Sequence, residues 1–79
     1  MNNTESLLNF LTESLIDNKS KYRVNRLESD NNILYSIQVS KDDLGRVIGK
    51  GGKTANAIRS FIYACNRNGK KINIKFEEL

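Results

Sequence analysis

The sequence predicts an α+β fold: a single domain in which helices cover one face of a small β-sheet. Apolar residues recur at helical spacing near the N-terminus and again after residue 53. They alternate with polar residues over 33–40 and 71–77, as expected of strands with one buried face. The length of 79 residues supplies a core of about three strands and two or three helices. The chain shows no repeats, low-complexity segments or linker, so it is interpreted as one compact unit.

The composition excludes several classes of function. The chain has no histidine and one cysteine, so it cannot form an internal disulfide or use histidine in acid–base catalysis. Structural zinc needs about four Cys, His or carboxylate ligands, so we expect no metal, no cofactor and no enzyme activity. No apolar run approaches the roughly 20 residues that span a bilayer, and the N-terminus has no signal-peptide pattern. We therefore expect a cytoplasmic protein without membrane insertion.

The charges are unevenly distributed along the chain. Thirteen Lys and Arg against nine Asp and Glu leave a formal charge of +4, which permits nucleic-acid binding without requiring it. Residues 1–18 contain acids and no base, whereas residues 44–76 contain no acid. The bases of this second segment are Arg46, Lys50, Lys53, Arg59, Arg67, Lys70, Lys71 and Lys75. The positive field therefore belongs to the half of the chain that contains the glycines at 49–52.

The first element is an amphipathic helix predicted over about 4–17. Leucines recur at helical spacing, and Asn2 or Thr4 can cap the start. An acidic helix with one apolar stripe is typical of a scaffold that covers a sheet.

An antiparallel hairpin is predicted next, over about 21–40. Its first strand, 21–28, is weakly patterned, while the second places Ile33, Tyr35, Ile37 and Val39 on one face. The intervening run Ser-Asp-Asn-Asn favours a turn, because Asn and Asp tolerate left-handed backbone angles.

Two helices joined by a glycine loop are predicted over about 42–67, before a last strand at about 71–77. Ser40 and Asp43 have the spacing of a capping box at the start of the first of these helices. The second, 53–67, is apolar over half its circumference, which is wider than packing on a small sheet requires. A neighbouring helix or a partner is expected to cover the excess. Cys65 lies in this apolar arc and is interpreted as a buried packing residue.

The glycine loop itself allows three interpretations. Gly52-Lys53-Thr54 resembles the end of a nucleotide-binding P-loop, but Val47 stands where that motif requires glycine, and a helix rather than a strand precedes it. A dinucleotide fingerprint also fails, because Thr54 stands where glycine or alanine is required. The third interpretation is the I-G-x-x-G loop of KH domains, matched by Ile48-Gly49-Lys50-Gly51-Gly52, which clamps a short single-stranded segment.

The segment from Val39 to Arg59 closely resembles the core of small bacterial single-KH RNA-binding proteins, the KhpA family. The resemblance extends over nearly the whole chain in length and element order. It implies one type II (prokaryotic) KH domain over 1–79, with the order α-β-β-α-α-β and a three-stranded sheet covered by helices on one face. The strand before the helix pair would run parallel to the last strand, which a right-handed crossover also favours. Family members often carry proline after the first helix, where this chain has Asn18-Lys19-Ser20.

The resemblance implies that the loop clamps single-stranded RNA with low sequence specificity. The candidate RNA-binding residues are Gly49, Lys50, Gly51, Gly52, Lys53, Thr54, Arg46, Ile48 and Arg59. Bases would lie in a groove between the helix pair and the adjoining strand. Its floor would include Val47, Ile48 and Ile58, of which Ile48 and Ile58 are equally well interpreted as ordinary core, and its wall the basic turn 67–71. Tyr63 is the one aromatic residue on a polar helix face, so stacking platforms are scarce.

The resemblance also implies a cellular role and partners. It suggests an RNA chaperone or post-transcriptional regulator linked to cell division, cell shape and envelope growth. It further suggests a homodimer and a heterodimer with a larger KH-domain partner, for which Phe61 and Ile62 are the candidate contacts. The alternatives are a dimerisation or adaptor module for that larger partner, and a ribosome-assembly factor. RNA against single-stranded DNA, and homodimer against heterodimer, stay open.

Overall fold

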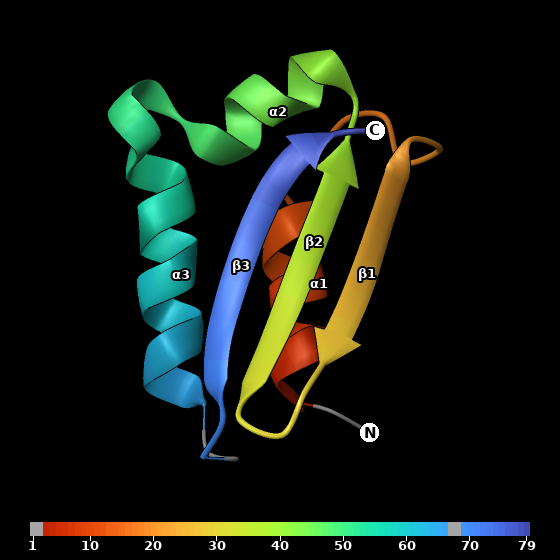
Figure 1. The fold of residues 1–79 in the computed structure, drawn as a ribbon. Helices are drawn as coiled ribbons and strands as arrows, with labels where there is room; N and C mark the ends of the chain where they lie inside the picture. The colour runs from red at the N-terminus through yellow and green to blue at the C-terminus, as the bar shows by residue number, and fades with distance from the viewer. Residues whose placement is uncertain (1–2, 67–68) are drawn as a thin grey trace.

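The computed structural model describes residues 3–66 and 69–79. Its elements follow the order α-β-β-α-α-β, which confirms the predicted fold class (Figure 1). They are α1 (Asn3–Glu13), β1 (Tyr22–Glu28), β2 (Asn32–Val39), α2 (Lys41–Ile48), the 3-10 turn η1 (Lys50–Gly52), α3 (Lys53–Cys65) and β3 (Lys71–Glu78).

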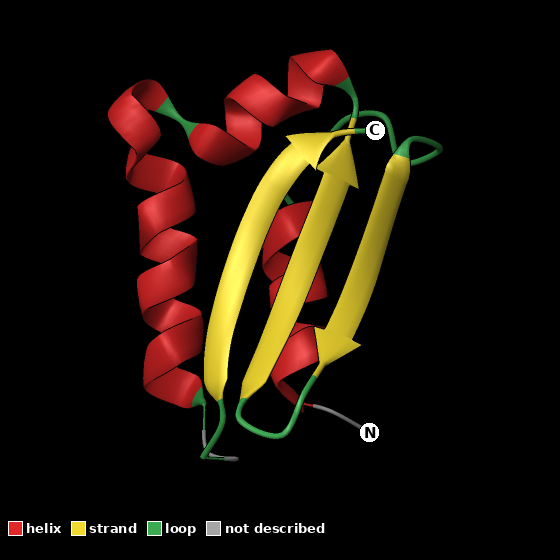
Figure 2. Cartoon of the chain, viewed as in Figure 1, coloured by secondary structure: helices red, strands yellow, loops and turns green. Residues whose placement is uncertain are grey.

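The three strands form one mixed sheet in the order β1-β2-β3. β1 and β2 are antiparallel, with Tyr22 opposite Val39. β2 and β3 are parallel, with Ile33 opposite Ile72, as the resemblance implied. Helix α1 lies against one face of the sheet, while α3 runs beside the edge strand β3 (Figure 2). The helix pair α2–α3 is thus the crossover between the two parallel strands.

The core lies between the sheet and the helices. Ile33, Tyr35, Ile37 and Val39 of β2 are fully buried, whereas the residues that alternate with them are partly exposed on the opposite face. The predicted alternation of this strand is therefore confirmed. The helices complete the core with fully buried Leu8, Val47 and Ile62.

Helix α1 ends at Glu13 rather than at the expected residue 17. The backbone amides of Asp17 and Asn18 each donate to the Asp43 carboxylate at 2.9 Å, which pulls the chain out of helical geometry. Ile16 still reaches the core, with 4% of its surface exposed. A side chain from α2 therefore determines how the connection from α1 to β1 is folded.

Asp43 performs more than the capping role that its position in the sequence predicts. The hydroxyl of Ser40 accepts a hydrogen bond from the Asp43 amide at 3.3 Å, which confirms the predicted N-cap of α2. The Asp43 carboxylate is almost fully buried and also accepts from Arg46 at 2.8 Å. The hydrogen bonds from the Asp17 and Asn18 amides are the main reason that the pKa of Asp43 falls to about 2.

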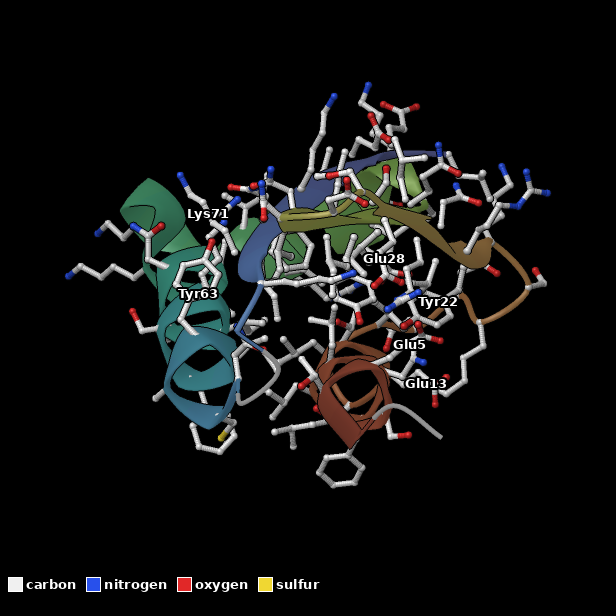
Figure 3. The ribbon with its side chains drawn as sticks, turned by 60° about the horizontal axis from the view of Figure 1, so that its bottom comes forward. Glu5, Glu13, Tyr22, Glu28, Tyr63 and Lys71 are labelled. Carbon is white, nitrogen blue, oxygen red and sulfur yellow. The ribbon has the colours of Figure 1, made fainter. Side chains whose placement is uncertain are left out.

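A second polar contact joins α1 to the sheet. The Tyr22 hydroxyl donates to Asn9 Oδ1 at 2.7 Å. Burial raises the pKa of Tyr22 to about 12, and the Glu13 carboxylate adds to this rise. Figure 3 shows Glu5 and Glu13 of α1 on the side of that helix that faces Tyr22. The phenol therefore stays a neutral hydrogen-bond donor through the physiological pH range.

The wide apolar arc of α3 is divided between core and surface. Ala55, Ile58 and Ile62 are buried against the sheet and α1. The exposed part of the arc consists of Ala57, Phe61, Ala64 and Cys65. The prediction that Cys65 is buried is wrong. Cys65 is exposed although it lies on the same side of α3 as buried Ile58, because it is the last residue of the helix, beyond the last buried turn at Ile62.

Candidate nucleic-acid interface

The loop between α2 and α3 depends on glycine at three positions. Gly49, Gly51 and Gly52 have φ angles of 76°, 64° and 80°, in the left-handed region that side chains disfavour. Gly49 ends α2 by donating its amide to Gly45 O at 2.9 Å, and the Gly52 amide donates to Gly49 O at 3.1 Å. These two bonds hold the chain reversal between the helices in one conformation.

Gly49 and Gly51 serve different purposes within this loop. A Cβ at Gly49 would lie 2.8 Å from Thr54 Cβ and closer still to Thr54 Oγ1, so the close packing of loop and helix requires glycine there. A Cβ at Gly51 would meet nothing within 4 Å. Gly49 therefore makes the loop compact, while the backbone at Gly51 is open to an approaching ligand. Thr54 acts in packing rather than as an exposed hydroxyl.

The loop opens directly onto the N-terminus of α3. Gly52 is the N-cap residue and supplies no side-chain acceptor to the first-turn amides. The positive end of a helix dipole with uncapped amides attracts anions. Lys50 and Lys53 are exposed on either side of this turn, and within residues 3–66 and 69–79 neither side chain has an ion-pair or hydrogen-bond partner. This combination favours a phosphate.

The two candidate arginines are bound to other parts of the protein. Arg46 contacts Asp43 at 2.8 Å and Asp17 at 3.1 Å, which ties α2 to the connection after α1. Arg59 donates to Ile74 O at 3.1 Å, and its guanidinium lies 5.5 Å from the centre of the Phe76 ring. Their first role is structural. Only Arg46 is paired with acids, so Arg59 keeps its charge but holds it against β3, and the freely exposed charge beside the loop comes from the lysines.

The apolar candidates for the groove floor lie mostly in the core. Val47 is fully buried and Ile58 is 6% exposed, so neither offers a surface on which a base could rest. Ile48 is half-buried and packs against the core. The core interpretation of Ile58, which the sequence left open, is the one that the structure shows.

A hollow of about 270 Å³ lies where the end of α3 meets the start of β3. Tyr63 and Asn66 of α3 line it together with Lys71, Ile72 and Asn73 of β3. Figure 3 shows Tyr63 and Lys71 close to one another. The sequence identified Tyr63 and the basic turn but missed Asn73, whose only signal is its place on the polar side of the β3 alternation. Arg67, also expected here, lies outside the described residues.

A larger hollow of about 450 Å³ lies at the start of α2. Acidic and basic residues both line it, and three of them, Asp17, Asp43 and Arg46, are joined by the contacts described above. We interpret it as a structural junction between α2 and the connection from α1 to β1.

The two candidate dimer contacts have different environments. Phe61 is 49% exposed, and Phe10 of the neighbouring helix α1 is 70% exposed. Ile62 is fully buried in the core, so its side chain is not available to a second copy. The expectation is corrected to Phe61 alone, because the direction of the α3 apolar arc relative to α1 cannot be read from spacing.

Two further features concern the described residues only. They contain no group of three or more Cys, Asp or Glu residues placed to hold a metal ion. They also contain no helix long and apolar enough to cross a membrane.

A mixed three-stranded sheet with a helix–GXXG–helix unit as its parallel crossover defines a KH domain of the type II order. A family model described as "KhpA/KhpB, KH domain" matches residues 5–76, and the chain belongs to this family.

Proteins named "RNA-binding protein KhpA" are similar to this chain over most of its length. The protein from Listeria monocytogenes is 39% identical over 75 residues, which cover 94% of this chain and 99% of the relative. The one from Oceanobacillus iheyensis is 36% identical, covering 85% and 89% of the two chains. The one from Aquifex aeolicus is 32% identical, covering 99% and 100%. No solved structure matches the chain significantly.

Proposed function

We propose that this protein binds short single-stranded RNA and that the loop from Gly49 to Gly52 holds the sugar-phosphate backbone. The observation that carries the proposal is an open glycine backbone at the uncapped N-terminus of α3, flanked by two exposed, unpaired lysines. The name "RNA-binding protein KhpA", which relatives of this chain bear, supports RNA as the ligand.

The binding follows from the chemistry of the loop. The backbone at Gly51 lets a nucleic-acid strand approach closely, and the first-turn amides of α3 face phosphate oxygens. Lys50 and Lys53 add sequence-independent charge. Arg46, Ile48 and Arg59 have a smaller part, because they already contact other residues. Such a site holds a strand without reading its bases, so sequence specificity is low. An RNA-chaperone or regulatory role in the cytoplasm, connected with cell division and envelope growth, is the role that the family resemblance suggests.

The test replaces Lys50 and Gly51 together with Asp. Both positions are exposed, and a Cβ at Gly51 meets open space in a backbone conformation that Asp tolerates better than most residues. We expect the fold to survive and the affinity for a single-stranded RNA octamer at low salt to fall at least tenfold, as measured by fluorescence anisotropy.

The matched control replaces Ser20 and Lys21 with Asp. This pair is also exposed and changes the net charge by the same amount, but it lies beyond the other end of α2. Its affinity for the octamer should stay close to that of the unmodified protein. Unchanged affinity in the loop variant would refute the assignment of the loop.

An adaptor function is favoured by a different observation. Phe10 and Phe61 are both largely exposed on neighbouring helices, and Ala57, Ala64 and Cys65 extend the apolar surface along α3. The α3 residues recur at helical spacing and so form a contiguous exposed apolar stripe, which is typical of an interaction site. We infer that this surface pairs with a second copy of the chain or with the KH domain of a larger partner. If pairing alone were the function, the variant with Asp at positions 50 and 51 would still bind its partner and would still carry out the protein's role in the cell.

A further inference from the structure

We propose that the open face of the sheet, the face opposite α1, docks an acidic amphipathic helix of a partner protein. This face is turned toward the viewer in Figure 1, where α1 lies behind the strands. It is separate from the glycine loop and from the apolar surface around Phe10 and Phe61. The inference therefore goes beyond RNA binding and adds a second, independent binding surface.

The strand register defines the residues of this face. Leu34, Ser36 and Gln38 alternate with the buried residues of β2, so they point away from α1. Residues directly opposite one another on paired strands share a face. The open face therefore consists of Arg23, Asn25 and Leu27 of β1, Asn32, Leu34, Ser36 and Gln38 of β2, and Lys71, Asn73, Lys75 and Glu77 of β3.

The open face carries more positive than negative charge. Its described residues include three cations, Arg23, Lys71 and Lys75, against one acid, Glu77. That acid is already bound within the face, because its carboxylate accepts from the Ser36 hydroxyl and lies 3.7 Å from Lys75 Nζ. The side chains of Arg23 and Lys71 have no ion-pair or hydrogen-bond partner in residues 3–66 and 69–79. A ligand that complements this face therefore brings negative charge.

Two leucines form an apolar centre on the face. Leu27 is 71% exposed, and Leu34, directly opposite on β2, is partly exposed. The described strands place no aromatic ring on this face, because Tyr22, Tyr35 and Phe76 all belong to the side that packs on the helices. Single-stranded nucleic acids are bound through stacked aromatic rings, whereas apolar contacts inside a polar rim are typical of protein interfaces. The face therefore suits a protein segment better than a second RNA strand.

The dimensions of the face match one helix. Three strands about 4.8 Å apart give a width of about 10 Å, which is the diameter of an α-helix with its side chains. Arg23 is opposite Gln38 and Lys71 is opposite Asn32, so these two cations are about 20 Å apart along the strands. A helix of about 14 residues covers this length. Acids near its two ends contact the two cations, and apolar side chains between them contact the leucines.

A second copy of the chain does not complement this face. Two open faces packed together would oppose like charges, since the one acid of each is already bound to Lys75. Helix α1 of a second copy is acidic, but its leucines pack on its own sheet, with Leu8 fully buried. The docked helix therefore belongs to another protein.

The experiment titrates the isotope-labelled protein with a synthetic peptide and follows the backbone amide shifts by NMR. The peptide has about 14 residues and blocked ends, with leucines at helical spacing and glutamate or alanine elsewhere. At low salt, the shifts should concentrate on the strand residues around Leu27 and Leu34, and added salt should weaken binding. The same peptide with lysine in place of glutamate should cause no shifts. The RNA octamer should bind to the peptide-loaded protein with unchanged affinity.

Leu27→Asp and Phe10→Asp are a matched pair of variants. Each introduces one acid at an apolar side chain of nearly equal exposure, 71% and 70%, but only Leu27 lies on the open face. Leu27→Asp should lower the affinity for the acidic peptide at least tenfold, whereas Phe10→Asp should leave it unchanged.

Arg23→Gln tests the charge without touching the leucines. It should lower the affinity for the acidic peptide roughly two- to fivefold. Lys41→Gln, at an exposed position on α2, is its control and should have no effect. The amide spectrum of each variant shows whether it is folded, so a Leu27→Asp variant that fails to fold leaves Arg23→Gln to decide.

Each other outcome overturns the proposal. If the acidic peptide shifts no amide of the open face, or if its affinity survives both Leu27→Asp and Arg23→Gln, the open face does not bind it. If Phe10→Asp alone abolishes binding, the peptide occupies the apolar surface of α1 and α3 instead. If the RNA octamer shifts the open face and displaces the peptide, the face binds RNA. If the protein alone gains mass in solution and Leu27→Asp prevents this, the face binds a second copy of the chain.

Discussion

Three glycines that look alike in the sequence have different physical requirements. Gly45 lies within α2 with nothing within 4 Å of a Cβ, Gly51 has a left-handed φ in open space, and Gly49 has both a left-handed φ and a close contact with Thr54. The sequence predicted that residues 49–52 form a loop. It could not show which of the glycines tolerates a side chain, because the contact of Gly49 with Thr54 depends on how the two helices meet.

Alanine substitutions at these glycines should therefore have three different effects on stability. Gly45→Ala should raise the free energy of unfolding by roughly 0.5–1 kcal/mol, because alanine is the better helix former. Gly51→Ala should lower it by about 1–2 kcal/mol through backbone strain. Gly49→Ala should lower it by about 1–3 kcal/mol more than that, because Thr54 must move. Urea unfolding followed by circular dichroism measures all three, and a Gly49→Ala variant as stable as Gly51→Ala would contradict the packing argument.

Asp43 gives the protein a defined sensitivity to acid. Its pKa is lowered from the usual 3.8 to about 2 in the folded state, mainly by the Asp17 and Asn18 amides. A lowered pKa stabilises the fold above the unfolded value near 4, and this contribution is lost as the pH falls toward 2. The Tm should therefore decline between about pH 4 and pH 2, with part of the decline due to Asp43.

Asp43→Asn isolates this contribution. An asparagine cannot accept from both loop amides and Arg46, so the Tm at pH 7 should fall by roughly 5–10 °C. The Tm of the variant should also decline less between pH 4 and pH 2 than the Tm of the unmodified protein does. Asp42→Asn is the control, since Asp42 is exposed on the same helical turn. An unchanged acid profile in Asp43→Asn would contradict the assignment.

At the scale of elements, regular patterns were predictable and the junctions between elements were not. The alternation of β2 and the helical spacing of α3 appear directly in the sequence, and the structure has a strand over Asn32–Val39 and a helix over Lys53–Cys65. The early end of α1 was not predictable, because its cause is Asp43, 26 residues away from the Asp17 amide that it binds. The division of the α3 arc into buried Ile62 and exposed Phe61 depends in the same way on where α1 packs.

The exposed flank of α3 leads to a prediction about association. Phe61→Asp places a charge on the proposed pairing surface without entering the core, so it should convert a dimer to a monomer at micromolar concentration with the fold intact. Sedimentation equilibrium measures the mass. Leu27→Asp is the control, since Leu27 is 71% exposed on β1, on the far side of the sheet from the helices. Equal masses for Phe61→Asp and the unmodified protein would show that this surface does not mediate pairing. Ile62→Asp is not a suitable test, because Ile62 is buried in the core and its replacement would unfold the protein.

At the scale of the whole molecule, the sequence predicted where the positive charge gathers but not how much of it is available. The bases of residues 44–76 look equivalent in the sequence. In the fold, Arg46 contacts two aspartates, Lys70 contacts Glu28, and Lys75 contacts Glu77. Arg59 donates to Ile74 O of β3. Three described lysine side chains of this segment have no such partner, Lys50, Lys53 and Lys71, and we expect them to supply most of the electrostatic part of RNA binding.

The salt dependence of RNA binding measures how many of these lysines neutralise a phosphate. For single strands, the logarithm of the binding constant falls with the logarithm of salt concentration with a slope of about −0.7 per neutralised phosphate, so three lysines predict a slope of roughly −2. Lys50→Gln should make the slope less steep by about 0.7, because the variant releases one counterion fewer on binding.

Lys71→Gln should do the same only if the strand extends past Tyr63 to the start of β3. Lys75→Gln should leave the slope unchanged, since Lys75 is paired with Glu77. Anisotropy titrations between 50 and 200 mM salt, roughly the range over which such slopes are measured, compare the three variants. A slope that is reduced for Lys50→Gln but unchanged for Lys71→Gln would show that the strand contacts only the glycine loop. A phosphate bound near the start of β3 would release its counterion into solution when Lys71 neutralises it, so losing Lys71 would then reduce the slope.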